Sequence, residues 1–135
     1  MASIRRTVLI DNAPANVWDA LRDVGALHTR LVVGFVTNCV LEEGARTVTF
    51  ANGMTARELI VDVNDQDRRV AWAVVGGRLT HHNASAQVFP APEGKSEVVW
   101  IADLLPNELA PAIATMIEQG LAAMKRTLEA TVPPR

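Results

Sequence analysis

The sequence predicts an α+β protein in which a seven-stranded antiparallel sheet lies against one long C-terminal helix. The first observation is a two-residue hydrophobic periodicity that fills residues 33–105 in short segments divided by polar or glycine-rich turns. The second is a single long 3.6-residue periodicity over Pro111–Thr131. The third is the length of 135 residues, which suits one domain spanning residues 1–135 with its own core.

The N-terminal elements are expected to be a strand and two short helices. The β-branched run Ile4–Ile10 predicts the strand, and Asp-Asn-Ala-Pro at 11–14 ends it in a turn. The apolar residues that follow have the spacing of the buried side of a short helix: Val17, Trp18 and Leu21. A second helical turn is expected over Asp23–Thr29, because Gly25 argues against one unbroken helix.

Six strands in three hairpins are expected to follow, at 33–42, Thr47–Ala51, Thr55–Val63, Arg69–Val75, His81–Phe89 and Glu97–Leu105. In the last three of these strands, every second residue is expected to lie on the face of the sheet that the helix covers. These residues are Val70, Trp72, Val74, His82, Ala84, Ala86, Val88, Val98, Trp100, Ala102 and Leu104. In the segment Thr55–Val63, Arg57 shares a face with Leu59, and we expect this face to point inward. Exposed residues on the outer face would permit a homodimer as well as a monomer: Ile60, Val99 and Ile101.

The long helix has an apolar face with a glycine in its middle. This face consists of Leu109, Ile113, Met116, Ile117, Gly120, Leu121, Met124 and Leu128. A glycine inside a helix costs about 1 kcal/mol relative to alanine. Gly120 therefore indicates either a hollow beneath the helix or a strand or indole ring that comes close to it. The helix is expected to end before a loose C-terminal segment at 132–135.

Small side chains on the covered face favour a cavity between sheet and helix: Ala84, Ala86 and Ala102. The alternative is that aromatic side chains fill the space: Phe35, Phe50, Trp72 and Trp100. If the cavity exists, we expect its lining to be Phe35, Val48, Phe50, Met54, Leu59, Trp72, Val74, Leu79, His82, Ala84, Trp100, Ala102, Ile113, Met116 and Gly120.

Six short segments in four groups, in this order and spacing, carry a resemblance to a known superfamily. They are Ala13–Leu21 after the first strand, Arg57-Glu58-Leu59 with Asp67-Arg68-Arg69, Val98-Val99-Trp100, and Gly120-Leu121 with Leu128-Glu129. In these segments the chain resembles the START-like ligand-binding superfamily, also called SRPBCC, and within it the polyketide cyclase/dehydrase-like group. The resemblance covers nearly the whole chain. It implies the helix-grip fold, a curved sheet wrapped around the C-terminal helix with a small-molecule cavity between them.

A narrower similarity is to the plant abscisic acid receptors of the same fold. Asn52-Gly53-Met54-Thr55 resembles their gate loop, and Val74–Thr80 is similar to the segment that carries their latch. The latch segment is shortened and lacks its histidine, and Val33 stands where those receptors carry an inward lysine. The resemblance therefore implies two loops that move on binding, but no anchor for a carboxylate hormone.

Few residues are candidates for catalysis. His82 is expected to face inward at the cavity mouth, where it could act as a general base, although a lone histidine more often bonds a backbone carbonyl or water. Arg57 could meet an acidic group of a ligand or, more often, form a salt bridge at the rim of the sheet with Glu58, Asp62 or another acid. Cys39 is expected to face inward as a small apolar group.

These residues favour a protein that binds a small hydrophobic or aromatic molecule. The first alternative is a polyketide aromatase/cyclase-like enzyme that works without a metal and relies on His82, Arg57 or Asn38. The second is a partner-docking protein that uses the loop at Asn52–Met54 and the outer surface of the long helix.

Composition excludes several other classes of function. The 13 basic and 15 acidic side chains give a net charge of −2, with no basic cluster among aromatics, so nucleic acid is not an expected partner. No apolar run approaches the roughly 18 residues that span a bilayer, and no signal peptide is recognisable, so the cytoplasm is the expected compartment. The single cysteine, the three histidines and the glycine spacings match no disulfide, zinc or nucleotide motif, so no cofactor is expected.

Overall fold

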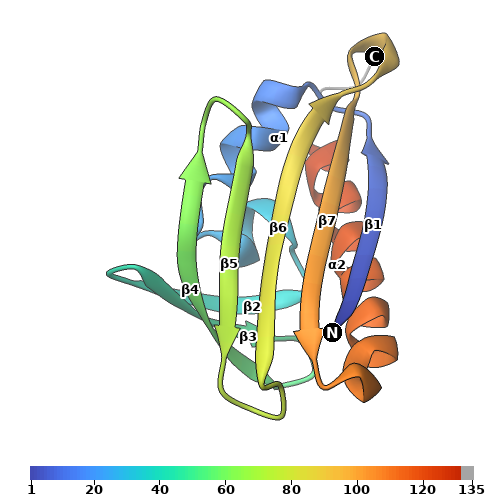
Figure 1. Cartoon of the computed structure of the whole chain (residues 1–135). Helices are drawn as coiled ribbons and strands as arrows, with labels where there is room; N and C mark the ends of the chain where they lie inside the picture. The colour runs from blue at the N-terminus through green and yellow to red at the C-terminus, as the bar shows by residue number, and fades with distance from the viewer. Residues whose placement is uncertain (132–135) are drawn as a thin grey trace.

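The computed structural model describes residues 1–131 and contains a seven-stranded antiparallel sheet with a long helix on one face (Figure 1). The strand order is β1-β7-β6-β5-β4-β3-β2, so each strand from β2 onward pairs with its neighbour in sequence, and β1 pairs with β7. The strands are β1 (Ala2–Ile10), β2 (Val36–Glu42), β3 (Ala45–Phe50), β4 (Thr55–Asn64), β5 (Arg69–Val75), β6 (His81–Pro90) and β7 (Ser96–Leu105).

Five helical segments connect or cover the strands within residues 1–131. They are α1 (Pro14–Leu21), the π-helical turn η1 (Leu27–Leu31), the 3-10 turns η2 (Pro92–Gly94) and η3 (Asn107–Leu109), and α2 (Ala110–Ala130). The predicted α+β helix-grip fold is confirmed, with seven strands and a long C-terminal helix. The second short helix differs: it is the π-helical turn, and it begins at Leu27 instead of Asp23. The C-terminal segment 132–135 lies outside the described residues.

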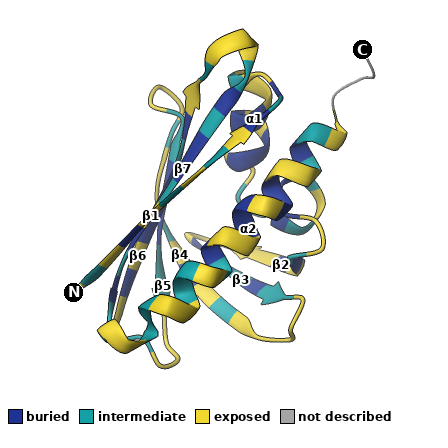
Figure 2. Ribbon diagram, turned by 90° about the vertical axis from the view of Figure 1, so that its right-hand side faces the viewer, coloured by how far each residue is buried: buried dark blue, intermediate teal, exposed yellow. Residues whose placement is uncertain are grey.

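Helix α2 turns its apolar face toward the sheet. Figure 2 shows this buried stripe along α2, and its members are Ile117, Gly120, Leu121, Ala123, Met124 and Leu128. Burial of such an apolar stripe supplies most of the stability of an amphipathic helix. Ile113 and Met116, in the first half of α2, are only partly buried because they border a cavity. The end of the helix therefore anchors the fold, while its beginning leaves space beneath it.

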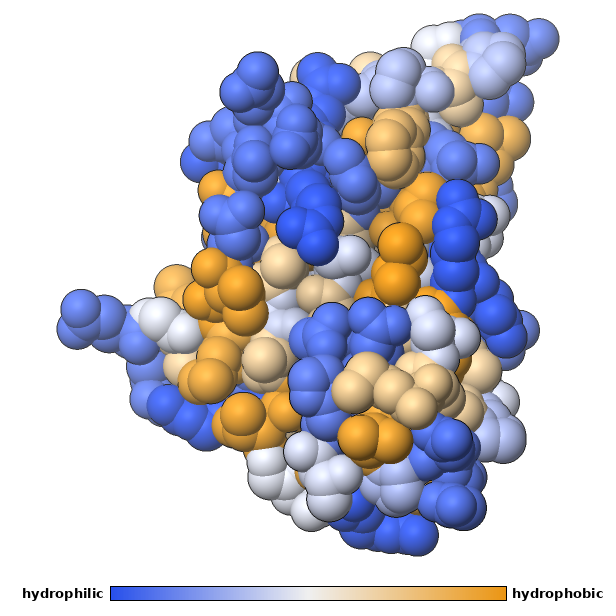
Figure 3. Space-filling view, in the orientation of Figure 1, coloured by the Kyte–Doolittle hydropathy of each residue, from blue (hydrophilic) through white to orange (hydrophobic). Residues whose placement is uncertain are grey.

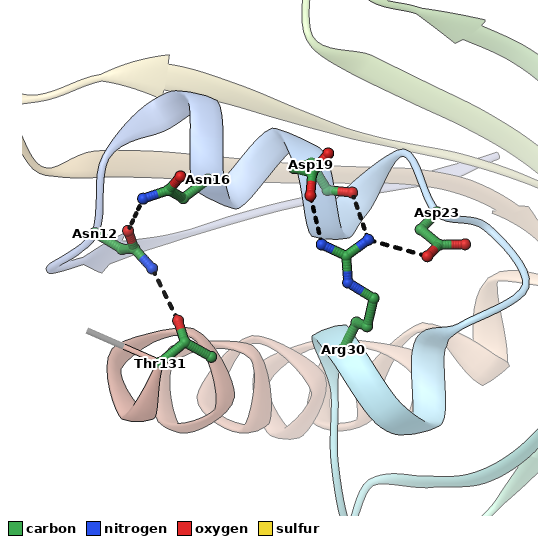
Figure 4. Close-up of polar contacts among 6 residues, drawn as sticks. All are labelled: Asn12, Asn16, Asp19, Asp23, Arg30 and Thr131. Atoms are coloured by element: carbon green, nitrogen blue, oxygen red, sulfur yellow. Dashed lines mark hydrogen bonds and ion pairs between the residues drawn. The ribbon is translucent and has the colours of Figure 1, made fainter. Parts of the chain in front are cut away.

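Asn12 joins the end of α2 to the start of α1. Its Nδ2 donates to the carbonyl oxygen of Leu128 at 2.8 Å and to Oγ1 of Thr131 at 3.2 Å, and its Oδ1 accepts from Nδ2 of Asn16 at 3.0 Å (Figure 4). The carbonyl oxygen of Asn12 also accepts a 2.7 Å bond from Oγ of Ser96, at the start of β7. The side chain and main chain of one buried residue thus bond polar groups of three elements at this corner.

Arg30 fixes η1 against α1. Its guanidinium contacts the carboxylates of Asp19 and Asp23, at 2.5 Å and 3.0 Å, in the arrangement drawn in Figure 4. All three side chains are substantially exposed, so these ion pairs orient the segment and contribute little stability.

Strand β4 presents the face opposite to the one that the sequence predicts. Glu58 is 7% exposed and points inward, whereas Leu59 and Val61 are 39% and 63% exposed. The alternation in β4 is ambiguous because both of its faces carry apolar residues. Glu58 lies inside because its direct partner across the sheet is Arg46 of β3, and the paired charges can share a buried position.

The outer face of the sheet carries scattered exposed apolar side chains. Figure 3 views this face, where hydrophobic atoms gather near its middle. The exposed apolar residues of this face include Leu59, Val61, Phe89 and Ile101. The expected exposure of Ile101 is confirmed at 37%, but Val99 is only 5% exposed and Ile60 is half-buried on the inner face. Monomer and homodimer both remain predictions.

Among residues 1–131, no helix is long and apolar enough to cross a membrane.

Candidate functional site

A cavity of about 860 Å³ lies between the inner face of the sheet and the first half of α2. Its wall is mostly apolar and includes aromatic rings from several elements: Phe35, Phe50, Trp72 and Trp100. Phe35 and Phe50 meet edge to face with ring centroids 5.4 Å apart, and Trp72 and Trp100 do so at 5.7 Å. These pairs hold each other in fixed orientations. The aromatic residues line the space without filling it.

Most of the residues that the sequence predicts for the cavity wall are placed there. Phe35, Val48, Phe50, Met54, Trp72, Val74, Leu79, His82, Trp100, Ile113 and Met116 all border the cavity. Four residues do not: Leu59, Ala84, Ala102 and Gly120. Leu59 lies on the opposite face of β4, as described above. Val33, compared above with an inward lysine, is 49% exposed and does not border the cavity.

Gly120 is buried beneath an indole ring and not beside a hollow. A Cβ at this position would lie 2.9 Å from Cζ3 of Trp100 and 3.3 Å from Cε2 of Phe35. Both distances are shorter than ordinary carbon contacts, so the glycine allows the helix to approach the aromatic rings. Gly120 therefore marks an indole ring that comes close to the helix, and the cavity lies nearer the start of the helix.

The small alanines of the covered face also make room for the tryptophans. Ala84 pairs directly with Trp72 on one side and Ala102 on the other, and Ala86 pairs with Trp100. Because cross-strand and diagonal neighbours on one face are in reach of large rings, the two indoles occupy the space that the alanines leave. Ala84 and Ala102 are buried beneath this layer and do not reach the cavity.

The wall contains a buried ion pair. Nε of Arg46 donates a 2.8 Å hydrogen bond to Oε1 of Glu58, and side-chain exposures are 4% and 9%. Nη1 of Arg46 donates to the carbonyl oxygen of Val24 at 3.1 Å, and its Cζ lies 5.4 Å from the ring centroid of Trp72. Burial raises the pKa of Glu58, and the charge and hydrogen bond of Arg46 oppose this shift. We regard the pair as ionised at neutral pH, because a neutral Glu58 would leave Arg46 buried without a counter-charge.

The sequence pattern does not predict this pair. The pattern predicts that the third strand begins at Thr47, whereas β3 begins at Ala45 and includes Arg46. It also predicts that Glu58 lies at the rim of the sheet. The spacing of Arg46, Val48 and Phe50 is the signal that could have found it, because residues two apart share a face of a strand.

Two further polar groups in the cavity wall lack hydrogen-bond partners. Nδ1 of His82 and Nε1 of Trp100 are buried, and neither is bonded within residues 1–131. Burial lowers the pKa of His82, and the neighbouring His81 adds to this effect. His82 therefore faces the cavity as a neutral imidazole at pH 7.

The other two candidate residues, Arg57 and Cys39, offer fewer polar groups to the interior of the cavity. Arg57 lies where the cavity meets the surface, and its Nη1 is 3.2 Å from Oε2 of Glu42. This ion pair is the surface salt bridge anticipated for Arg57, but with a different acid. Cys39 is buried, and burial raises the pKa of its thiol. A thiol of this kind behaves as an apolar group.

The cavity reaches the surface between two loops and the start of α2. The β3–β4 loop contributes Asn52 and Met54, and the β5–β6 loop contributes Gly76–Leu79; both loops lie at the lower end of the view in Figure 1. Gly76 and Gly77 adopt φ values of +84° and +71°, which side-chain-bearing residues rarely adopt. These glycines shape the rim of the opening.

Solved structures share this architecture at low sequence identity. An uncharacterised protein of Bacillus thuringiensis superimposes with a TM-score of 0.84 at 20% identity, over 94% of this chain and 98% of the other. The di-domain ARO/CYC BexL of the BE-7585A biosynthetic pathway gives 0.83 at 19% identity, over 99% of this chain and 48% of BexL. Norcoclaurine synthase of Thalictrum flavum gives 0.73 at 17% identity, over 99% and 94%.

Sequence comparison assigns the family. A search of curated proteins finds no significant match. The family model described as polyketide cyclase / dehydrase and lipid transport matches residues 1–129, which is nearly the whole chain. Its SRPBCC-type fold is the one that the structure has. The chain therefore belongs to the polyketide cyclase / dehydrase and lipid transport family.

Proposed function

We propose that this protein binds a small hydrophobic or aromatic molecule in the cavity between the sheet and α2. The observation that carries the proposal is the cavity itself, about 860 Å³ with a wall made largely of apolar and aromatic side chains. Pockets of this size and composition are typical of small-molecule sites. The family description, which names both cyclases and lipid transport, supports the same class of ligand.

The expected affinity is modest. A guest that buries roughly 200–300 Å² of apolar surface gains about 5–7 kcal/mol at roughly 25 cal/mol per Å², before the entropic losses of binding. Before those losses, this range corresponds to a dissociation constant between about 0.2 mM and about 10 μM, and a polar contact would strengthen it. We propose that the loops containing Asn52–Met54 and Gly76–Leu79 admit the guest.

A catalytic function is the second candidate. It is favoured by two ionisable side chains in the same wall, His82 and Glu58. A neutral imidazole in an apolar site can accept a proton from a bound substrate. BexL, a neighbour of the same fold, is described as an aromatase/cyclase, but its 19% identity supports the fold alone. The binding function needs no such step, and we therefore prefer it.

Native mass spectrometry of freshly purified protein tests the binding proposal directly, because a retained small molecule appears as an added mass. A matched pair of variants tests the location. Val74→Phe adds a ring inside the cavity, whereas Ala73→Phe adds the same ring on the other face of β5. We expect Val74→Phe to weaken binding of naphthalene at least tenfold and Ala73→Phe to leave it unchanged.

Equal binding of naphthalene by both variants would place the guest elsewhere. Turnover of a bound molecule that is lost in His82→Gln, with binding retained, would instead favour the enzyme.

A further inference from the structure

The Arg46–Glu58 pair has unused hydrogen-bonding capacity. A guanidinium and a carboxylate commonly form two parallel hydrogen bonds, but here a single one joins Nε to Oε1. Nη1 of Arg46 is bonded to Val24, and neither Nη2 of Arg46 nor Oε2 of Glu58 has a hydrogen-bond partner within residues 1–131. One donor and one acceptor therefore remain on a pair that borders the cavity.

These two atoms differ from the other polar groups of the wall. Nδ1 of His82 and Nε1 of Trp100 also lack partners, but both are shut off from solvent by surrounding atoms. Nη2 of Arg46 and Oε2 of Glu58 are not enclosed by surrounding atoms, although the two side chains are almost wholly buried. The ion pair is therefore a buried, charged feature of the wall that a guest can reach directly.

The charges of the pair determine which polar group it can hold. Arg46 and Glu58 cancel each other, so the buried part of the wall offers no net counter-charge to an ionised ligand. The lining also includes Arg57 and Arg78, but both are exposed at the opening of the cavity. A carboxylate would gain from Arg46 but face Glu58, and it would lose its hydration on entering. A hydroxyl group both accepts and donates, so it can take the free N–H of Arg46 and give its own hydrogen to Glu58. The ring of Trp72, which lies beside Arg46, offers an apolar surface to the body of such a molecule.

We propose that the Arg46–Glu58 pair selects uncharged ligands that carry a hydroxyl group, and that it rejects their carboxylate analogues. The inference rests on the proposed binding function and adds to it the chemical class of the ligand. It also assigns the specificity to two residues whose removal as a pair leaves the apolar wall in place.

Three probes of similar shape test the proposal in the full-length protein: naphthalene, 2-naphthol and 2-naphthoate. Binding is followed at pH 7 by the indole N–H signals of the three tryptophans in ¹⁵N-labelled protein. Trp72 and Trp100 border the cavity, whereas Nε1 of Trp18 is bonded to Oδ1 of Asp65 outside it. Shifts of Trp72 and Trp100 with a constant Trp18 signal report binding in the cavity.

We expect 2-naphthol to bind about tenfold more tightly than naphthalene, because a hydrogen bond to a charged group contributes at least that much. We expect 2-naphthoate to bind no more tightly than naphthalene. In Arg46→Leu/Glu58→Leu, the preference for 2-naphthol should fall to about twofold, while naphthalene still binds. An exposed pair outside the cavity lining offers the matched control, and Arg6→Leu/Glu118→Leu should keep the preference of the natural protein.

Each outcome decides between the possibilities. Equal affinities for 2-naphthol and naphthalene, or tightest binding of 2-naphthoate, would overturn the selection proposal while leaving the binding function intact. A preference for 2-naphthol that survives in Arg46→Leu/Glu58→Leu would assign the selection to other residues. Failure of all three probes, naphthalene included, would overturn the binding function and this inference with it. The ranking of the probes by the natural protein is decisive even if the double variant does not fold.

Discussion

Gly120 of α2 lies directly against the indole of Trp100, so that a Cβ at position 120 would stand 2.9 Å from Cζ3 of the ring. The contact joins the middle of the long helix to the middle of β7. Trp100 also meets the ring of Trp72 edge to face, at 5.7 Å between ring centroids. The ring therefore has little freedom to move away from the helix, and the glycine is required for packing.

Gly120→Leu is expected to reduce the free energy of unfolding by about 1–3 kcal/mol, because extra carbon atoms in a filled contact force neighbouring side chains out of position. The higher helix propensity of leucine offsets only part of this loss. Urea denaturation measures the change. Ala122→Leu, at an exposed position of the same helix, is the control and should stay within about 0.5 kcal/mol of the natural protein. Unchanged stability in Gly120→Leu would mean that space exists at this point.

Replacing one member of the buried ion pair should be more harmful than replacing both. Arg46→Leu or Glu58→Leu leaves a buried charge without its partner, which costs about 3–5 kcal/mol. The double variant removes both charges and should recover most of the loss. A double-mutant cycle of unfolding free energies measures the coupling. The exposed pair of Arg57 and Glu42 should contribute less than about 1 kcal/mol in the same experiment. Strictly additive losses at Arg46 and Glu58 would contradict the buried pair.

The stability of the protein should fall on mild acidification through His82. Burial lowers its pKa in the folded chain below 6.5, so the unfolded chain binds a proton more readily. The contribution of His82 to the free energy of unfolding is fully present above pH 6.5. It is lost as the pH falls from there toward the pKa that His82 has in the folded chain. Urea midpoints measured between about pH 5 and 8 should show this slope, and His82→Gln should remove it. His81→Gln should retain the slope; a slope that persists in His82→Gln would assign it to another group.

Asn12→Ala should destabilise the corner between α1 and α2 by about 1–3 kcal/mol, because the buried carbonyl of Leu128 loses its donor. Thermal unfolding monitored by circular dichroism measures the loss. Asn38→Ala removes the same side chain from an exposed position of β2 and should have little effect. Similar stability of the two variants would show that water replaces the bonds of Asn12.

The order of elements follows directly from the sequence. In strands β5, β6 and β7 the parity of the large apolar residues is consistent, and it assigns Trp72, Ala84 and Trp100 to the covered face. The amphipathic pattern of α2 is equally clear. Local periodicity is sufficient for these elements because each buries one face against a single large apolar layer. The same regularity supports the family resemblance, which the match over residues 1–129 confirms.

The tertiary structure alone decided which face of β4 is buried, what Gly120 accommodates and which charges enter the cavity wall. Both faces of β4 carry apolar residues, so its orientation depends on the pairing of Glu58 with Arg46 on another strand. Gly120 is compatible with a hollow or with a ring, and only the position of Trp100 distinguishes them. A sequence pattern reports the average environment of one element, whereas a cavity is the space that several elements leave between them.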